Sequence, residues 1–342
     1  MKYIWKSKRF MIGLLYLIAV MSASFIYTYG FQADIPKPPK YIYGDKGQII
    51  GTHPASPLLY PPMGTGRFGD QIFLQVLEGA KFTISLAIGI ALIRLFSGVI
   101  CGVMLSLYTK KLKPFFRYFG EMFHYIPTIF TAFILIAPVM YAIHDNRENV
   151  SPNIPLLLYE AAVAVFVVWP SLSLYVSDEI DTFMKKEYMV SARLLGASRR
   201  HLIRRHLSVL FQERLLLLFI QHAVQTLILF THMGLLQLFI GGVQYKELYE
   251  NDYRPVSLSN EWSGLIGLNY FEANLKPWVV LGPLFAFALT IFFLNLMAAG
   301  LKAAMEKRER VLNQSAVEEA HTDYEISEQS FTFAKGSAQS IH

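Results

Sequence analysis

The apolar residues of this sequence fall into long runs that polar or basic stretches separate. A helix of roughly 20 apolar residues crosses a bilayer core about 30 Å thick. The runs predict six spans: Phe10–Tyr29, Phe82–Tyr108, Met122–Ile143, Ile154–Val176, Leu215–Ile240 and Trp278–Leu301. Helices of a large soluble core are the alternative, but only 16% of the residues are charged, against about a quarter in soluble domains. We therefore expect an all-α integral membrane protein with about six transmembrane helices.

Lysine and arginine gather in four regions: the N-terminal flank, the turn after the second span, the segment after the fourth, and the end of the sixth. Cytoplasmic loops carry an excess of these residues, and the basic regions alternate with poorer ones. We therefore expect a multi-pass protein with both termini in the cytoplasm and external loops at about 31–80, 144–153 and 242–276. This topology explains the net charge of +6, so the charge does not indicate a nucleic-acid partner.

These features divide the chain into four segments. They are an N-terminal transmembrane anchor (1–30), a Pro- and Gly-rich external loop (31–80), a core of five helices (81–306) with a cytoplasmic segment at 177–210, and a polar tail (307–342). The first span could instead be a signal peptide, but its apolar run exceeds the usual core of about 7–15 residues. Proline and glycine argue against long helices in the external loop, and the polar tail is predicted to be mobile.

The chemistry-bearing motifs of the sequence are few. The stretch from Gly64 to Gly69 fits the dinucleotide pattern G-x-G-x-x-G, but it lies in the Pro-rich loop rather than between a strand and a helix. The sequence contains no G-x-x-x-x-G-K-[ST] motif, no metal-ligand spacing and no nucleophile–base set, and its one cysteine, Cys101, lies in an apolar run. We therefore expect no cofactor, no metal site and no catalytic residue.

The segment after the fourth span has a helical pattern of its own. Four residues fall at helical spacing on one face: Tyr188, Ser191, Ala192 and Leu195. Gly196 can end this helix, and Ser198 can cap a second helix that leads into the fifth span. Such a corner could transmit a push from a cytoplasmic partner. A basic loop that only fixes the topology is the alternative.

This segment resembles the EAA loop of ABC importer permeases, which reads approximately E-Y-x-x-A-A-x-x-x-G-A-S. The matching residues are Glu187, Tyr188, Ala192, Gly196, Ala197 and Ser198, with Ser191 in place of the first alanine. Arg205-His206 resembles the R-H pair that follows in the dipeptide/oligopeptide (peptide/nickel) transport family, although Val209 stands near the usual proline. Weaker matches to C-type permeases of that family extend over about residues 60–306 and include Gly64-Thr65, Gly79-Ala80-Lys81 and Pro277-Trp278.

The resemblance implies a type I importer permease in a bacterial inner or plasma membrane. It implies a second permease as partner in a heterodimer, cytoplasmic ABC ATPase subunits, an external or periplasmic solute-binding protein, and contact with membrane lipid. The segment Glu187–His206 would dock into the ATPase, and ATP hydrolysis would occur on that separate chain, so this chain is not expected to be an enzyme. The solute would be a peptide, nickel or another small molecule.

Polar side chains within the spans are candidates for the translocation path. Arg94 lies near the middle of the second span, where a charge is costly and marks a functional candidate. It either contributes to the path or pairs with a carboxylate such as Glu121 or Glu160.

A second set of path candidates shares one face of the fifth span: Gln221, Gln225 and His232. Hydrogen bonds between helices are the alternative role for these three side chains. An ATP-independent channel or ion-coupled transporter would need carboxylates near the centres of the spans, which contain few. A membrane enzyme would need a catalytic cluster, and none is visible in the sequence.

Overall fold

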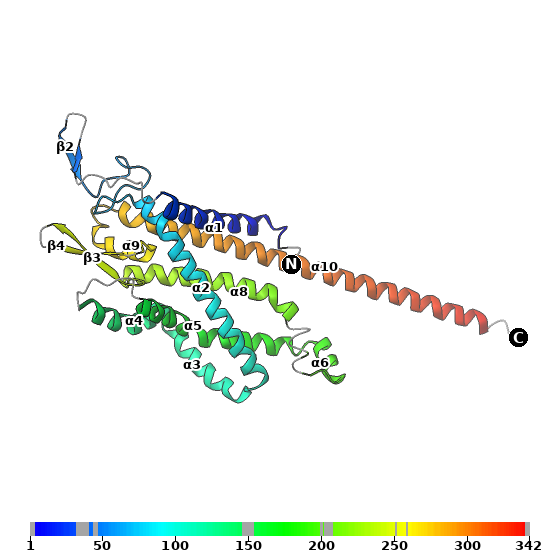
Figure 1. Cartoon of the computed structure of the whole chain (residues 1–342). Helices are drawn as coiled ribbons and strands as arrows, with labels where there is room; N and C mark the ends of the chain where they lie inside the picture. Colours follow the sequence, from blue (N-terminus) through cyan, green and yellow to red (C-terminus); the bar gives the residue numbers. More distant parts are fainter. Residues whose placement is uncertain are drawn as a thin grey trace.

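The computed structural model describes residues 4–31, 41–43, 47–145, 154–198, 201, 208–249, 252–257 and 259–338. Long helices run side by side, and two small β-hairpins lie at one end of the molecule (Figure 1). The helices are α1 Lys8–Ile26, α2 Ile72–Leu107, α3 Lys113–Tyr125, α4 Thr128–Asp145, α5 Ile154–Phe183, α6 Glu187–Leu194, α8 Ser208–Leu235, α9 Trp262–Asn269 and α10 Trp278–Ala338. Strand β1 (Tyr41–Tyr43) pairs antiparallel with β2 (Ile49–Thr52), and β3 (Val243–Tyr249) pairs antiparallel with β4 (Asp252–Ser257).

Five of the six predicted spans are confirmed as helices long and apolar enough to cross a membrane: Lys8–Phe31, Ile72–Leu107, Ile154–Phe183, Gln212–Leu235 and Trp278–Arg308. The prediction of one helix over Met122–Ile143 is wrong, because α3 ends at Tyr125 and α4 begins at Thr128. Ile126 between them is extended, with φ −101° and ψ 122°. A residue that precedes proline is pushed out of the helical region, and Pro127 follows Ile126.

Two other predicted boundaries differ from the structure. Helix α2 begins at Ile72, so the boundary placed at residue 80 lies inside this helix. Helix α10 continues to Ala338, whereas the segment from 307 onward was predicted to be a polar, mobile tail. That segment contains no proline and is rich in alanine and glutamate, which favour helix.

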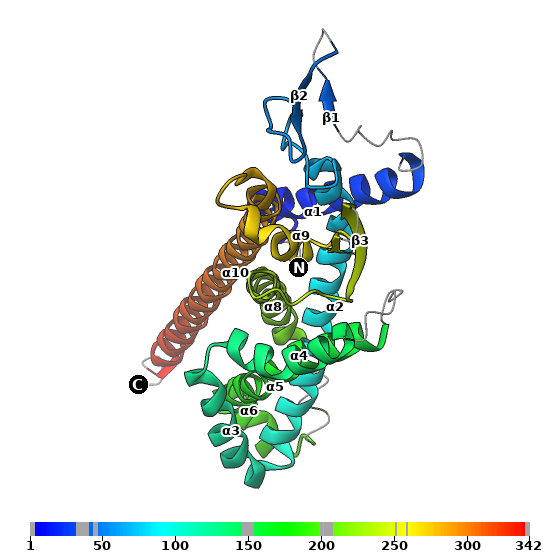
Figure 2. The ribbon, with the colours of Figure 1, turned by 90° about the vertical axis from the view of Figure 1, so that its left-hand side faces the viewer.

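Close helix contacts hold the bundle together. Helix α8 lies in the middle of the molecule, with α10, α9, α2 and α4 around it (Figure 2). Helix α1 lies along α10, where Tyr16 stacks on Phe293 with ring centroids 4.0 Å apart. At the other end of this contact, a Cβ added to Gly300 would lie 2.6 Å from the backbone nitrogen of Phe10.

The end of the molecule that carries the hairpins also carries α9. Trp262 is buried there, donating its indole N–H to the Val76 carbonyl at 2.8 Å and its backbone N–H to the Thr83 hydroxyl at 3.0 Å. The G-x-G-x-x-G stretch forms a turn against this end. Its Gly64 has φ +76°, and the buried Thr65 hydroxyl accepts the Ala55 N–H at 2.8 Å. These contacts give the stretch a structural role in the turn.

Candidate functional site

Helix α6 lies at the end of the molecule opposite the hairpins (Figure 1). Gly196 ends it, as the sequence predicts, with φ +87° and its N–H donated to the Arg193 carbonyl at 2.9 Å. The Ser198 hydroxyl accepts the His201 N–H at 3.3 Å, as a helix cap would. The remainder of the predicted second helix, at 202–207, lies outside the described residues.

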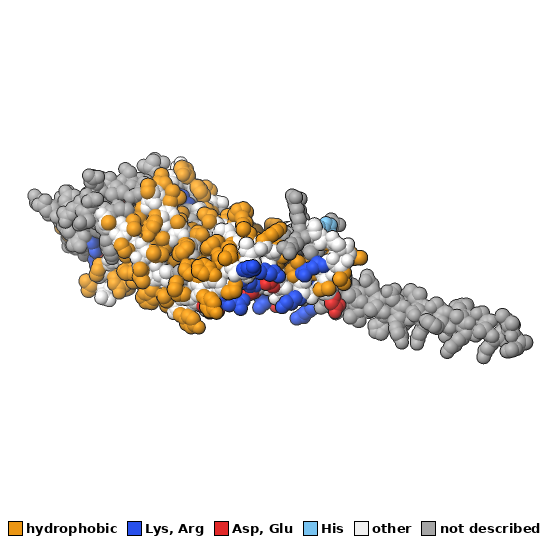
Figure 3. All heavy atoms as spheres, turned by 90° about the horizontal axis from the view of Figure 1, so that it is seen from below, with side chains coloured by type: hydrophobic (Ala, Val, Ile, Leu, Met, Phe, Trp, Pro, Cys, Tyr) orange, Lys and Arg blue, Asp and Glu red, His pale blue; other side chains and the backbone are white. Residues whose placement is uncertain are grey.

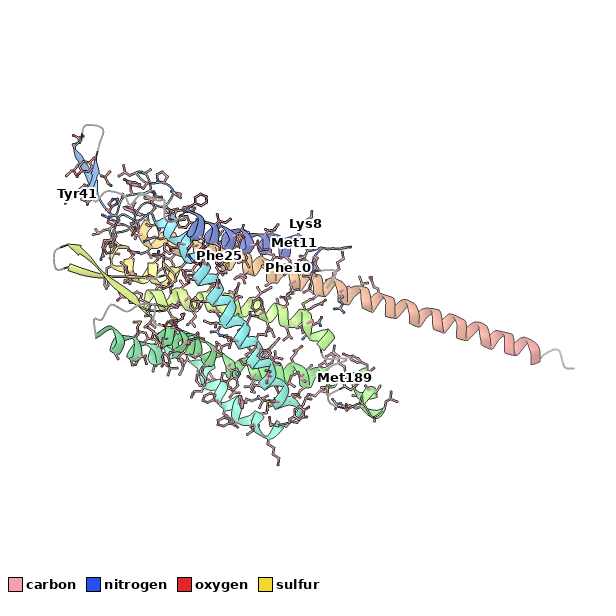
Figure 4. The ribbon with its side chains drawn as sticks, in the orientation of Figure 1. Lys8, Phe10, Met11, Phe25, Tyr41 and Met189 are labelled. Atoms are coloured by element: carbon pink, nitrogen blue, oxygen red, sulfur yellow. The ribbon has the colours of Figure 1, made fainter. Side chains whose placement is uncertain are left out.

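One side of α6 is anchored on the body of the protein. Met189 is 0% exposed and packs with Leu107, Ile180 and Phe183 at the ends of α2 and α5. Figure 4 places Met189 where α6 meets the rest of the molecule. Ala192 and Ala197 pack against the same cluster. Sequence reasoning missed Met189, although its three-residue spacing from Ala192 is the signal that would have found it.

The other side of α6 is exposed. The residues that the sequence predicts on one face therefore lie partly against the body of the protein and partly in solvent. Tyr188 lies edge-on to Phe183 and is 44% exposed, and Ala192 points toward the body. Besides Tyr188, the exposed residues are Glu187, Val190, Ser191, Arg193, Leu194 and Leu195. Leu194 and Leu195 are 83% and 88% exposed. Apolar side chains this exposed beside charged ones are typical of a surface that binds a partner.

Ion pairs connect the end of α5, the helix that precedes α6, to α3. Lys113 Nζ lies 2.7 Å from Asp178 Oδ1 and 2.5 Å from Asp181 Oδ2, near the end of α5. Burial alone would lower the pKa of Lys113, but hydrogen bonds to both carboxylates outweigh it and raise the pKa. Figure 3 shows lysine and arginine gathered toward this end, while hydrophobic side chains cover the face toward the hairpins. The end of α5, against which α6 packs, is thus tied to α3 through charged groups.

Arg94 is buried at the junction of α2, α5 and α8. Its Nε and Nη2 donate to the Ala164 carbonyl at 2.9 and 2.5 Å, and its Nη1 donates to the Thr226 hydroxyl at 2.9 Å. No carboxylate among the described residues forms an ion pair with it. Glu160 instead accepts the Gly241 N–H at 2.9 Å, and Glu121 is exposed. The carboxylate pairing suggested for Arg94 is therefore wrong in this structure.

The three polar residues predicted on one face of the fifth span lie on an exposed side of α8. Gln221, Gln225 and His232 are all exposed, and His232 Nδ1 lies 2.7 Å from the Ile228 carbonyl. Arg94 contacts the buried side of the same helix at Thr226. The structure therefore separates Arg94 from the other three path candidates.

Glu160 and Glu261 are buried carboxylates, and Glu261 was not singled out from the sequence. Glu160 of α5 and Glu261, which precedes α9, are 3% and 1% exposed, and Glu261 accepts a hydrogen bond from the Ser263 hydroxyl. Burial raises the pKa of Glu261 to about 7, although hydrogen bonds from Ser263, Gly264 and Ile240 act to lower it. No sequence signal distinguished Glu261 from the other residues of an external loop. Within the described residues, no three His, Cys, Asp or Glu side chains come together to hold a metal ion.

Comparison with known proteins agrees with this architecture. Residues 95–311 match the model of the family described as binding-protein-dependent transport system inner membrane component. The chain is 24% identical over 254 residues to the oligopeptide transport system permease protein OppC of Haemophilus influenzae, covering 73% of this chain and 71% of that protein. It is 27% identical over 154 residues to the inner membrane ABC transporter permease protein YejE of Escherichia coli, covering 45% of this chain and 41% of that protein. Since the family match spans more than half of its length, the chain belongs to the inner membrane components of binding-protein-dependent ABC transport systems.

Proposed function

We propose that this chain forms half of a translocation path for peptides or related small solutes and that α6 couples it to a separate ATPase. The exposed side of α6 carries the proposal, because Leu194 and Leu195 are held in solvent by an anchor, Met189, that is fully buried. The likeness to an oligopeptide permease over 73% of the chain supports the peptide class.

The partners proposed here follow from the family. They are cytoplasmic ABC ATPase subunits that hydrolyse ATP, a second permease in a heterodimer, an external solute-binding protein, and lipid around the apolar spans. Both termini lie in the cytoplasm in this arrangement. ATP and the loaded binding protein drive transport only if each favours one conformation of the permeases over the other.

The packing of α6 supports a route for this coupling. A force on Leu194 and Leu195 reaches Met189, which touches Phe183 at the end of α5. From α5 it reaches α3 through the ion pairs of Lys113 with Asp178 and Asp181. Rigid contacts of this kind let a small displacement at a docking helix become a movement of the spans.

The test is affinity purification of the transporter in mild detergent, together with solute uptake. Glu187→Lys and Leu195→Asp should remove the ATPase from the purified complex and abolish uptake, while the chain still inserts into the membrane. Leu58→Asp is the matched control, because Leu58 is 94% exposed on the segment between β2 and α2, away from α6, and should leave ATPase binding unchanged. Normal coupled ATP hydrolysis and uptake in both docking variants would contradict the assignment, as would an active homo-oligomer that purifies without any ATPase.

A further inference from the structure

The break between α3 and α4 leaves polar backbone exposed. The side chains of Tyr125, Ile126, Pro127 and Thr128 are all exposed around the break. The last carbonyls of α3 have no partner within the helix, as at any helix end. Ile126, which caps α3, is extended and therefore does not continue the helix.

The break lies within the thickness of a membrane. We take the ion pair of Arg117 with Asp178, at 3.4 Å, as the polar boundary near α6. At a rise of 1.5 Å per residue, Tyr125 lies about 12 Å beyond Arg117 along α3. Helix α4 then continues for 18 residues toward the end with the hairpins (Figure 1). A hydrocarbon core about 30 Å thick therefore contains the break, in its half nearer α6.

A carboxylate with no partner among the described residues lies on the same face of α3 as Tyr125. Glu121 falls between Tyr118 and Tyr125 at helical spacing, and all three side chains are exposed. No described residue forms an ion pair or hydrogen bond with Glu121. The opposite side of α3 is fixed against α5, where Phe116 meets Trp169 edge-on with ring centroids 5.7 Å apart.

Neither the broken backbone between α3 and α4 nor the carboxylate of Glu121 is stable in contact with lipid. Irregular backbone at membrane depth occurs only where protein buries it or where it lines a water-filled cavity, and a carboxylate in a span faces a bundle interior or a cavity. Since Tyr125 is 88% exposed and Glu121 is also exposed, the body of this chain does not bury them. Building on the proposed function, we propose that Glu121, Tyr118, Tyr125 and the α3–α4 break line the water-filled path and select for solutes carrying a positive charge, such as the terminal ammonium of a peptide.

Cysteine labelling of the complete transporter in membrane vesicles tests this proposal. The chain has one native cysteine, so Tyr125→Cys is introduced into Cys101→Ala and labelled with two membrane-impermeant methanethiosulfonates, one cationic and one anionic. Only the thiolate reacts, so a thiol in lipid stays unlabelled. We expect labelling at residue 125, with a cationic-to-anionic rate ratio that falls about tenfold when Glu121→Gln is added. Glu121→Asp should keep the ratio.

Phe96→Cys in the same background is the matched control. Phe96 is 72% exposed on the continuous helix α2, where only lipid is expected, and it should not react. The proposal is overturned if residue 125 fails to react in vesicles where Leu195→Cys does react. It is also overturned if Glu121→Gln leaves the rate ratio unchanged. Labelling needs neither ATP nor a transported solute, so its outcome is independent of whether an ATPase copurifies with the chain.

Discussion

At the scale of single residues, a buried charge can lower the stability of the fold and still serve the function. Arg94 is 1% exposed and has hydrogen bonds but no carboxylate partner among the described residues. A buried charge without a counter-charge destabilises the fold. Its position among the spans therefore makes Arg94 a candidate for a functional role.

The variant Arg94→Met tests whether Arg94 has a role in transport. The Ala164 carbonyl lies inside α5, and the Thr226 hydroxyl donates its own hydrogen bond to the His222 carbonyl at 2.8 Å. Neither group therefore loses its last hydrogen-bond partner when the arginine is replaced. Thermal stability in detergent should stay unchanged or rise, while the uptake rate falls by a factor on the order of ten, within the usual range of coupling energies. Unchanged uptake with normal expression would show that Arg94 is dispensable for transport.

The buried carboxylate Glu261 predicts a pH dependence of stability. Its pKa is raised from 4.5 to about 7, so between these values the folded state keeps a proton that the unfolded state has lost. Stability should therefore fall as the pH rises from about 4.5 to about 7, by roughly 3 kcal/mol at 1.36 kcal/mol per pKa unit. Glu261→Gln should reduce this fall by the share that Glu261 contributes, in thermal unfolding measured across the range. Asp70→Asn, toward the same end of the molecule, should not change it.

At the scale of elements, most helices could be predicted because a membrane span needs only length and apolarity. The end of α6 was also predictable, since Gly196 readily takes the positive φ found there. The break at Ile126 was not predicted, although Pro127 was a local signal for it, because the apolar run continues through both residues. The start of α2 at Ile72 was missed because the nearby prolines and glycines suggested a loop over the whole stretch.

The crossing of α2 and α5 depends on glycine. A Cβ at Gly102 would lie 2.7 Å from the Cβ of Val176 and 2.9 Å from the Ser173 carbonyl, so Gly102→Val should force the helices apart. We expect a destabilisation of about 1–3 kcal/mol, measured by thermal unfolding in detergent. Gly89 of the same helix has no atom within 4 Å of an added Cβ. Gly89→Ala should therefore be neutral or stabilise by up to about 1 kcal/mol. Equal effects at both sites would contradict the close crossing.

At the scale of the whole molecule, many contacts join residues far apart in the sequence. Arg67 pairs with Glu272 at 2.5 Å, and Arg94 meets Ala164 and Thr226 on two other helices. No pattern in one sequence reveals such partners, which is why Arg94 was assigned a carboxylate that it does not contact. The division of α6 into an anchored and an exposed side also depends on the position of α5.

The orientation of the whole molecule in the membrane is a prediction that combines the basic flanks with the pairing of the first and last spans. The close approach of Gly300 to Phe10 brings the start of α1 beside α10, at the point where α10 extends beyond the bundle toward the end with α6 (Figure 1). The basic flanks predict that this end is cytoplasmic. In a Cys101→Ala background, an impermeant maleimide should label Leu58→Cys only in right-side-out vesicles and Leu195→Cys only in inside-out vesicles. Both side chains are highly exposed, so failure to label cannot arise from burial within this chain. The reverse pattern would show that the basic flanks do not set the orientation, and labelling of both from one side would show that the hairpins and α6 do not lie across the membrane from each other.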